Sequence, residues 1–258
     1  MELKNAVCIV TGSASGIGAA SAIMLAGKGA RVLVNYSKSE EAARATLKAC
    51  ADAGADTLLV KADVAQDADC RRLAQAALDK WGRIDALVNN AGVTKFASHS
   101  DLDALSAEDF QRIYAVNVVG SYQMVRACAP AMKKGGRGAV VNVSSIAGKN
   151  GMGSSIAYAA SKGALNTMTM SLARVLGPEI RVNAVCPGMV DTKWLREGYG
   201  PRYAAIEARY RQGTALGRPA TPEDVAGVIV WLIEGADLVT GDTIMVDSGM
   251  HMGLNPSK

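Results

Sequence analysis

The stretch Thr11-Gly12-Ser13-Ala14-Ser15-Gly16-Ile17-Gly18 decides the fold class of this 258-residue chain. It follows a short apolar run at residues 6–10 and precedes a segment of helical periodicity at residues 17–28. Glycines here allow a tight turn and let backbone N–H groups approach a pyrophosphate, to which the following helix N-terminus adds a partial positive charge. The stretch therefore predicts a strand–turn–helix unit that binds a dinucleotide.

Short apolar runs alternate with helical segments along the rest of the chain. The predicted strands are residues 6–10, 31–35, 56–61, 84–88, 138–143, 180–185 and 243–246. The predicted helices are residues 17–28, 39–53, 67–81, 104–134 (two helices or one bent helix), 156–176 and 222–234. The strands are apolar on consecutive residues, which is typical of parallel strands covered on both faces. We predict an α/β fold: a single doubly wound Rossmann domain over residues 1–258, with a seven-stranded parallel sheet and helices on both faces.

Capping residues mark the starts of three of these helices. Ser39 is expected to be an N-cap, and Ser106 is expected to form a capping box with Asp109. Thr221 is expected to cap the helix that begins at Pro222, because proline is well tolerated at the first helical position.

Composition excludes several classes of function. The net charge is +4 and no run of Lys and Arg exceeds two residues, so we expect no nucleic-acid partner. The two histidines have no partner at ligand spacing, which argues against a metal site and a Ser-His-Asp triad. The five cysteines form no CxxC motif and are expected to be reduced and mostly buried. No signal peptide or membrane-spanning stretch is recognisable, so we expect a cytoplasmic protein with no membrane partner.

Further motifs follow the glycine-rich turn in a fixed order. They are Asp63-Val64, Asn89-Asn90-Ala91-Gly92, Asn117, Ser145, the Tyr158/Lys162 pair, and Pro187-Gly188 with Val190 and Thr192. With these motifs and their spacing, residues 7–249 resemble the short-chain dehydrogenase/reductase family. The resemblance implies an NAD(P)(H)-dependent oxidoreductase that interconverts a ketone and a secondary alcohol. It assigns Asn117, Ser145, Tyr158 and Lys162 to catalysis. The residues that it assigns to cofactor binding are Gly12, Ser13, Ser15, Gly16, Ile17, Gly18, Asn35, Tyr36, Ser37, Asp63, Val64, Asn90, Ala91, Gly92, Tyr158, Lys162, Pro187, Gly188, Val190 and Thr192.

The Tyr158/Lys162 pair suits acid–base chemistry because residues four apart share one face of a helix. An ordinary tyrosine pKa near 10 is too high for a general base, and a nearby ammonium would lower it. Lowering the tyrosine pKa from about 10 to neutrality requires about 4 kcal/mol of interaction that favours the phenolate. A cationic nicotinamide could supply the part that the lysine does not. Tyr158 would then donate a proton to the developing alkoxide, while Ser145 would hydrogen-bond the substrate oxygen. The resemblance further implies that Lys162 binds the nicotinamide ribose and that Asn117 holds a proton-relaying water.

The end of the second predicted strand bears on the choice of cofactor. Asn35, Tyr36, Ser37 and Lys38 provide no aspartate to bind a ribose 2′-hydroxyl or to repel a 2′-phosphate. Asn35, Ser37 and Lys38 could instead donate to that phosphate, which favours NADP(H). NAD(H) stays possible, since many NADP-preferring relatives carry Arg or Lys where this chain has Ser15.

The substrate recess is expected to be lined by residues 151–155, Met189 and a lid insert at about residues 191–218. The insert is rich in basic residues: Lys193, Arg196, Arg202, Arg209, Arg211 and Arg218. These could attract an acyl carrier protein or a coenzyme A thioester, or they could be the solvated face of a lid helix.

Among relatives, the chain most resembles the 3-oxoacyl-[acyl-carrier-protein] reductase-like group, which implies a thioester or other small-molecule carbonyl substrate. An NAD-dependent sugar or polyol dehydrogenase is the alternative enzyme. A non-catalytic cofactor sensor would be expected to lack Tyr158 or Lys162, and both are present. The resemblance also implies a homotetramer assembled through residues 104–134, residues 156–176 and the C-terminal strand.

Overall fold

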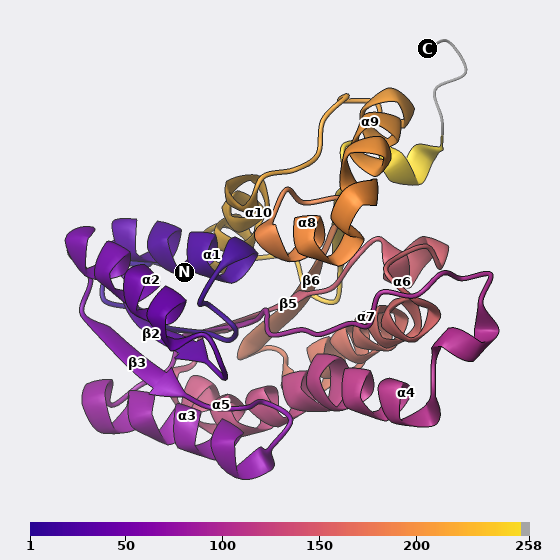
Figure 1. The fold of residues 1–258 in the computed structure, drawn as a ribbon. Helices are drawn as coiled ribbons and strands as arrows, with labels where there is room; N and C mark the ends of the chain where they lie inside the picture. The colour runs from indigo at the N-terminus through magenta and orange to yellow at the C-terminus, as the bar shows by residue number, and fades with distance from the viewer. Residues whose placement is uncertain (254–258) are drawn as a thin grey trace.

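The computed structural model describes residues 1–253 and contains one sheet of seven parallel strands (Figure 1). The strand order is β3-β2-β1-β4-β5-β6-β7, which confirms the predicted doubly wound sheet. The strands are β1 (Val7–Val10), β2 (Arg31–Tyr36), β3 (Thr57–Lys61), β4 (Ala86–Asn89), β5 (Gly138–Val143), β6 (Ile180–Pro187) and β7 (Thr243–Val246). The order reverses direction between the neighbours β1 and β4, and ligands of such sheets bind beyond the carboxyl ends of the strands at that point.

Helices cover both faces of the sheet. The helices on one face are α1 (Gly16–Gly27), α2 (Glu40–Asp52) and α10 (Pro222–Glu234) (Figure 1). The helices on the other face are α3 (Asp67–Trp81), α5 (Ser121–Gly135) and α7 (Ile156–Leu176). Alternate strand residues supply the two cores: Cys8 and Val10 pack under α1 and α10, whereas Val7 and Ile9 pack under α3 and α5. All four are fully buried, as their consecutive apolar pattern predicts.

All three predicted N-cap residues occupy the N-cap positions of their helices. The hydroxyls of Ser106 and Thr221 each accept a backbone N–H three residues on and form complete capping boxes. Ser39 occupies the N-cap position of α2, but its side chain makes no capping hydrogen bond. Its ψ angle is 72°, against 168° for Ser106 and 163° for Thr221.

The predicted helix at residues 104–134 is one bent structure interrupted by a wider turn. After a 3₁₀ turn η1 (Leu102–Ala104), the helix α4 (Ala107–Tyr114) runs into a π-helical turn η2 (Ala115–Gly120) and then α5. A Cβ on Gly120 would lie 2.8 Å from Val64 Cγ2, so glycine lets this turn press against the loop after β3. Such π turns often occur at functional sites, and this one holds the fully buried Asn117.

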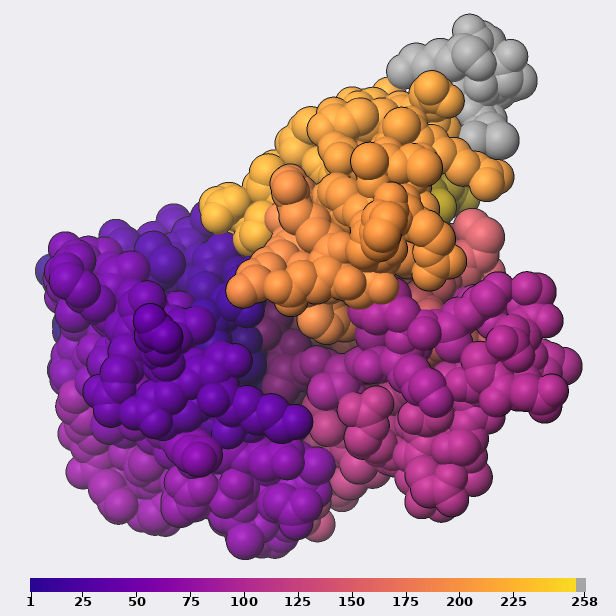
Figure 2. Space-filling model, in the orientation of Figure 1, coloured from indigo at the N-terminus to yellow at the C-terminus, as the bar shows by residue number. Residues whose placement is uncertain are grey.

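The insert between β6 and α10 folds into the helices α8 (Lys193–Tyr199), η3 (Gly200–Arg202) and α9 (Tyr203–Gly213). Its base is an apolar cluster of Met189, Tyr203 and Tyr210, and the Tyr210 hydroxyl donates to the Asp247 carbonyl at 2.6 Å. In Figure 2 this orange segment stands above a recess that separates it from the indigo N-terminal part. The insert therefore lies where the carboxyl ends of the strands open.

Smaller elements complete the structure. A short helix α6 (Ala147–Asn150) follows β5, and a 3₁₀ turn η4 (Met250–Met252) follows β7. All five cysteines lie within residues 1–253 and are buried free thiols, as predicted. None of the helices in that range has the length and apolar character needed to cross a membrane.

Candidate active site

The glycine-rich turn after β1 is fastened to the loop after β4. Gly12 has a φ of 61°, and a Cβ there would lie 2.8 Å from the Ala91 Cα, so both the conformation and the space require glycine. The Asn90 Nδ2 donates to the carbonyls of Thr11 and Gly12 at 3.0 and 2.9 Å. The two motifs that the sequence placed at the cofactor site therefore form one rigid floor.

The far end of the same turn opens helix α1. Gly16 has a φ of 55°, and the first turn of α1 carries no acidic residue that could occupy its N–H groups. Ser15 is exposed and its side chain makes no capping hydrogen bond. The N-terminal N–H groups of a helix lack intrahelical partners, so this end offers backbone and hydroxyl donors to a pyrophosphate. The turn thus fits a dinucleotide cofactor.

Asn35 has a structural role here in place of the expected direct contact with a phosphate. It is 1% exposed, and its Oδ1 accepts the Gly12 N–H at 3.0 Å. Its Nδ2 donates to the carbonyls of Val60 and Ala62 at 3.2 and 3.1 Å, so its donors are already used. Ser13 is buried beside it and accepts the Asn35 N–H. Both residues shape the glycine turn from beneath, because a buried carboxamide must satisfy its own hydrogen bonds.

The other predicted adenine-side residues differ in accessibility. Tyr36 is buried and its hydroxyl is hydrogen-bonded to Glu40, whereas Ser37 and Lys38 are exposed at the end of β2. Asp63 is exposed after β3, and Val64 is buried against Gly120. Ser37, Lys38 and Asp63 are therefore the side chains on this edge that can reach a ligand.

The four predicted catalytic residues converge at the carboxyl ends of β4 and β5. Tyr158 and Lys162 lie one turn apart on α7, and the Lys162 Nζ is 5.6 Å from the centre of the Tyr158 ring. Ser145 follows β5 and is hydrogen-bonded to the Tyr158 hydroxyl. A Cβ on Gly92 would lie 3.5 Å from the Asn117 Oδ1 and 3.8 Å from the Lys162 Nζ, so a side chain there would fill the space beside the ammonium.

Burial dominates the ionisation of the catalytic pair. It raises the pKa of Tyr158 to about 12, although the hydrogen bond with Ser145 acts in the opposite direction. It lowers the pKa of Lys162 to about 8. The expectation that Lys162 lowers the tyrosine pKa is not met in the protein alone, because its Nζ donates to the Val143 carbonyl at 2.7 Å and is itself desolvated. The phenol therefore keeps its proton at neutral pH.

Asn117 ties the loop after β4 to the catalytic helix. Its Oδ1 accepts the Val93 N–H at 2.8 Å, and its Nδ2 donates to the Val93 carbonyl and to the Ser161 hydroxyl, both at 3.0 Å. Ser161 in turn donates to the Tyr158 carbonyl at 2.7 Å. Ser161 escaped prediction because a serine inside a helix carries no signal for such a link, and its contact with Asn117 exists only in the folded chain.

The motif after β6 forms the wall opposite the glycine turn. The Gly188 N–H donates to the Val246 carbonyl at 3.0 Å, and a Cβ on Gly188 would lie 2.5 Å from the Tyr210 hydroxyl. Val190 forms a bridge with Ala220, and Thr192 caps α8. The Thr192 Cγ2 lies 3.5 Å from the Cβ position of Gly16, so the insert begins beside the glycine turn.

An aromatic cluster that the sequence did not predict stands next to Tyr158. Phe96 packs against Trp194 and Tyr199, and the Trp194 ring centre is 6.4 Å from that of Tyr158. Met189, which was expected to line the recess, is only 8% exposed and is buried beneath the insert with Tyr203 and Tyr210. Met189 packs in this position because burial of its side chain against Tyr203 and Tyr210 stabilises the base of the insert.

Ion pairs neutralise most of the basic insert. Arg196 pairs with Asp191, Arg211 with Glu207, Arg218 with Asp224 and Lys193 with Glu197. Arg202 and Arg209 form no ion pair within residues 1–253. The insert therefore presents far less unpaired charge than its composition suggests.

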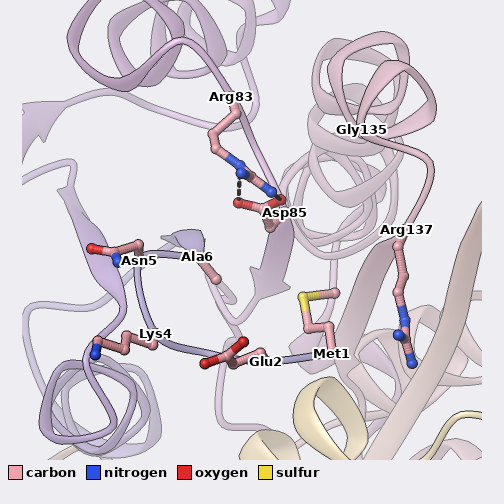
Figure 3. Close-up of a pocket in the computed structure, with 9 residues that line it drawn as sticks. All are labelled: Met1, Glu2, Lys4, Asn5, Ala6, Arg83, Asp85, Gly135 and Arg137. Atoms are coloured by element: carbon pink, nitrogen blue, oxygen red, sulfur yellow. Dashed lines mark hydrogen bonds and ion pairs between the residues drawn. The ribbon is translucent and has the colours of Figure 1, made fainter.

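A cavity at the opposite end of the sheet is unrelated to this chemistry. It has a volume of about 290 Å³ and lies at the amino ends of β1, β4 and β5, where Figure 3 shows Arg83 paired with Asp85. The buried Asp85 carboxylate also accepts the Val7 N–H at 2.8 Å, so it serves to hold two strands together. All the motif residues lie at the other, carboxyl edge of the sheet.

Comparisons with known proteins agree with this geometry. A family model described as "Enoyl-(Acyl carrier protein) reductase" matches residues 12–251. The chain is 44% identical, over 95% of its length and 96% of the relative's, to a Streptomyces violaceoruber protein described as ketoacyl reductase 2 of the granaticin polyketide synthase. It is 37% identical, over 98% and 100% of the two lengths, to L-rhamnose 1-dehydrogenase (NAD(P)(+)) of Azotobacter vinelandii.

A crystal structure from Burkholderia xenovorans, described as a short-chain dehydrogenase/reductase, has a TM-score of 0.91 and 43% identity, covering 96% of this chain and 99% of that one. The chain belongs to the short-chain dehydrogenase/reductase family. It is an oxidoreductase, and membership of the family implies an NAD(P) cofactor.

Proposed function

We propose that this enzyme reduces a 3-oxoacyl thioester or a related ketone to the secondary alcohol, with NADPH preferred over NADH. The observation that carries the proposal is the convergence of Ser145, Tyr158 and Lys162 beside the glycine turn. The similarity to a protein described as a ketoacyl reductase supports the choice of substrate.

Each residue has a defined part in this reaction. When bound, the nicotinamide supplies the hydride that adds to the carbonyl carbon. Ser145 hydrogen-bonds the carbonyl oxygen, and Tyr158, a neutral phenol because burial raises its pKa to about 12, donates its proton to that oxygen. Lys162 would hold the nicotinamide ribose, and it is charged at neutral pH because its pKa is about 8. Asn117 fixes the position of the catalytic helix through Ser161.

The cofactor preference rests on the end of β2. Ser37 and Lys38 are exposed there, and no carboxylate within residues 1–253 pairs with Lys38. Glu40, the first acid after the strand, is already bonded to Arg44 and Tyr36. A 2′-phosphate would therefore meet a hydroxyl and an ammonium. The insert acts in this proposal as a lid over the substrate, with the unpaired Arg202 and Arg209 available to an acidic carrier.

A second candidate is an NAD(P)-dependent sugar dehydrogenase, which the 37% identity to an L-rhamnose 1-dehydrogenase favours. The same catalytic group would then oxidise the anomeric hydroxyl of a sugar ring. Because Asn35 has no donor left, the preference for NADP depends on two residues only. A mixed use of both cofactors would suit this candidate.

The test is to follow nicotinamide absorbance at 340 nm. The protein is assayed with 3-oxobutyryl-N-acetylcysteamine and NADPH or NADH, and with L-rhamnose and NADP⁺ or NAD⁺. We expect reduction of the thioester, faster with NADPH, and its loss in Tyr158→Phe while NADPH still binds. Turnover of rhamnose alone would support the second candidate. Full activity in Tyr158→Phe would overturn the mechanism itself.

A further inference from the structure

The aromatic cluster joins two distant segments over the catalytic tyrosine. Phe96 lies in the loop after β4, whereas Trp194 and Tyr199 lie at the two ends of α8. The Phe96 ring centre is 5.7 Å from that of Trp194 and 5.1 Å from that of Tyr199. Both pairs are tilted or edge-to-face, which is the arrangement in which aromatic rings attract one another.

Gly198 makes this contact possible. A Cβ at this position would lie 2.0 Å from the Phe96 Cζ, so the ring rests directly on the backbone of α8. Phe96 therefore fixes α8, and with it Trp194, at one distance from Tyr158. The packing of the cluster is specific, because it requires the three aromatic side chains and also the absence of a Cβ at Gly198.

The surface that this cluster offers is apolar. Trp194 remains 47% exposed although its ring faces Tyr158 at 6.4 Å. On another side of the tyrosine, the Cβ position of Gly153 lies 3.4 Å from the Tyr158 Cδ1, and the neighbouring Met152 is also exposed. An exposed indole beside the Tyr158 ring favours a planar or ring-bearing ligand.

Several hydrogen-bonding groups near the cluster already have partners. The Thr94 hydroxyl bonds the hydroxyls of Ser154 and Ser155 at 2.8 and 3.4 Å, and Arg196 pairs with Asp191. A polyhydroxylated ligand placed here would lose water without gaining matching partners, and each unpaired buried hydroxyl is costly. The geometry is unfavourable to a sugar.

We propose that Phe96, Trp194 and Tyr199 form an aromatic wall that selects carbonyl compounds carrying an aromatic or fused-ring body next to the reacting carbon. This inference rests on the proposed reductase function and deepens it. The ketone is reduced to a secondary alcohol as the reduced nicotinamide is oxidised, and the alcohol oxygen takes its proton from Tyr158. Trp194 acts by stacking against the ring system and takes no part in proton transfer.

The test compares two ketones in the full-length enzyme with NADPH. The ketones are 2-tetralone, which has a fused ring, and 3-oxobutyryl-N-acetylcysteamine, which has none. We expect Trp194→Ala to lower kcat/KM for 2-tetralone about tenfold more than it lowers kcat/KM for the thioester. The matched control is Trp231→Ala, because Trp231 on α10 is also 47% exposed and lies outside the site. An equal loss of kcat/KM on both ketones, or no loss on either, would contradict the proposal that the aromatic wall selects the substrate.

A binding measurement separates this inference from the reductase proposal. In the Trp81→Phe/Trp231→Phe variant, Trp194 is the only tryptophan left. We expect 2-tetralone to quench its fluorescence with saturation, and Phe96→Ala to weaken that binding by about tenfold. Quenching without turnover would retain the wall and reject the proposed reaction. Turnover of both ketones with no quenching would retain the reaction and reject the wall.

Discussion

The Lys162 ammonium donates a hydrogen bond of 2.7 Å to the Val143 carbonyl, the last residue of β5. The lysine is thus anchored to the sheet while it lies against the ring of Tyr158. Its position does not depend on a carboxylate, and a buried ammonium without an opposite charge is costly. That cost has a measurable pH dependence.

Lys162→Met should change the pH dependence of stability. Burial lowers the pKa of Lys162 from 10.5 to about 8. Below pH 8 the lysine is charged in both the folded and unfolded states. Between pH 8 and 10.5 the unfolded chain binds the proton and the folded chain does not, so this lysine makes the free energy of unfolding rise with pH. The full effect is about 3 kcal/mol.

Urea unfolding of wild type and variant at several values in this pH range measures the effect. The difference between the two free energies of unfolding cancels the contribution of all other titrating groups. The loss of the hydrogen bond to Val143 adds only a constant to that difference, so the change of the difference with pH reports on Lys162. We expect the wild type to gain stability relative to Lys162→Met as the pH rises. A constant difference would show that Lys162 is not desolvated.

The two directions of the reaction should respond differently to pH. Tyr158 keeps its proton at neutral pH because burial raises its pKa to about 12. Reduction uses the neutral phenol, whereas oxidation needs the phenolate. Below the Lys162 pKa of about 8, we expect kcat/KM for oxidation of the alcohol to rise about tenfold per pH unit, and that for reduction to stay level. An oxidation profile that is already flat at neutral pH would contradict this assignment.

Ser37→Asp tests the basis of the cofactor preference. A carboxylate at this exposed position would repel a 2′-phosphate and could accept a hydrogen bond from a 2′-hydroxyl. We expect NADPH to bind about tenfold more weakly, with NADH unchanged within about threefold, in calorimetric titrations of the protein. Ser37→Ala is the matched control. An unchanged ratio of the two affinities would remove the argument for NADP.

Two glycines in helices should respond in opposite ways to alanine. Gly227 on α10 has no atom within 4 Å of its Cβ position, so Gly227→Ala should stabilise the protein by about 0.5–1 kcal/mol. In Gly198→Ala the new methyl group would overlap the Phe96 ring, so we expect a net loss of about 1–2 kcal/mol. Denaturant unfolding measures both effects. If the overlap is the cause, adding Phe96→Ala to Gly198→Ala should make the alanine at 198 nearly harmless.

Local sequence signals were enough to predict the sheet and the pairing of Tyr158 with Lys162. Val7, Cys8, Ile9 and Val10 are apolar without interruption, and that pattern is typical of a strand covered on both faces. The pairing of Tyr158 with Lys162 follows from helical spacing alone. These features depend on short stretches of chain, so reading them requires no knowledge of distant contacts.

Features that depend on distant contacts were not predictable. Asn35 was expected to face a phosphate, yet its carboxamide is hydrogen-bonded to the Gly12 N–H and to the carbonyls of Val60 and Ala62. Met189 was expected in the recess but serves as the base of the insert. The contact of Phe96 with Trp194 joins residues nearly a hundred positions apart, and no periodicity links them. Only the fold decides whether such side chains face a ligand or one another.

The aromatic wall comes from the loop after β4 and from helix α8, and neither contributes a strand to the sheet. Phe96 and Trp194 can therefore be exchanged without disturbing the packing of the strands or the anchoring of Lys162 to Val143. In such a molecule the catalytic residues can be conserved in evolution while the residues that select the substrate change. A lineage could acquire a new substrate through changes in these two segments while its catalytic machinery stayed nearly constant.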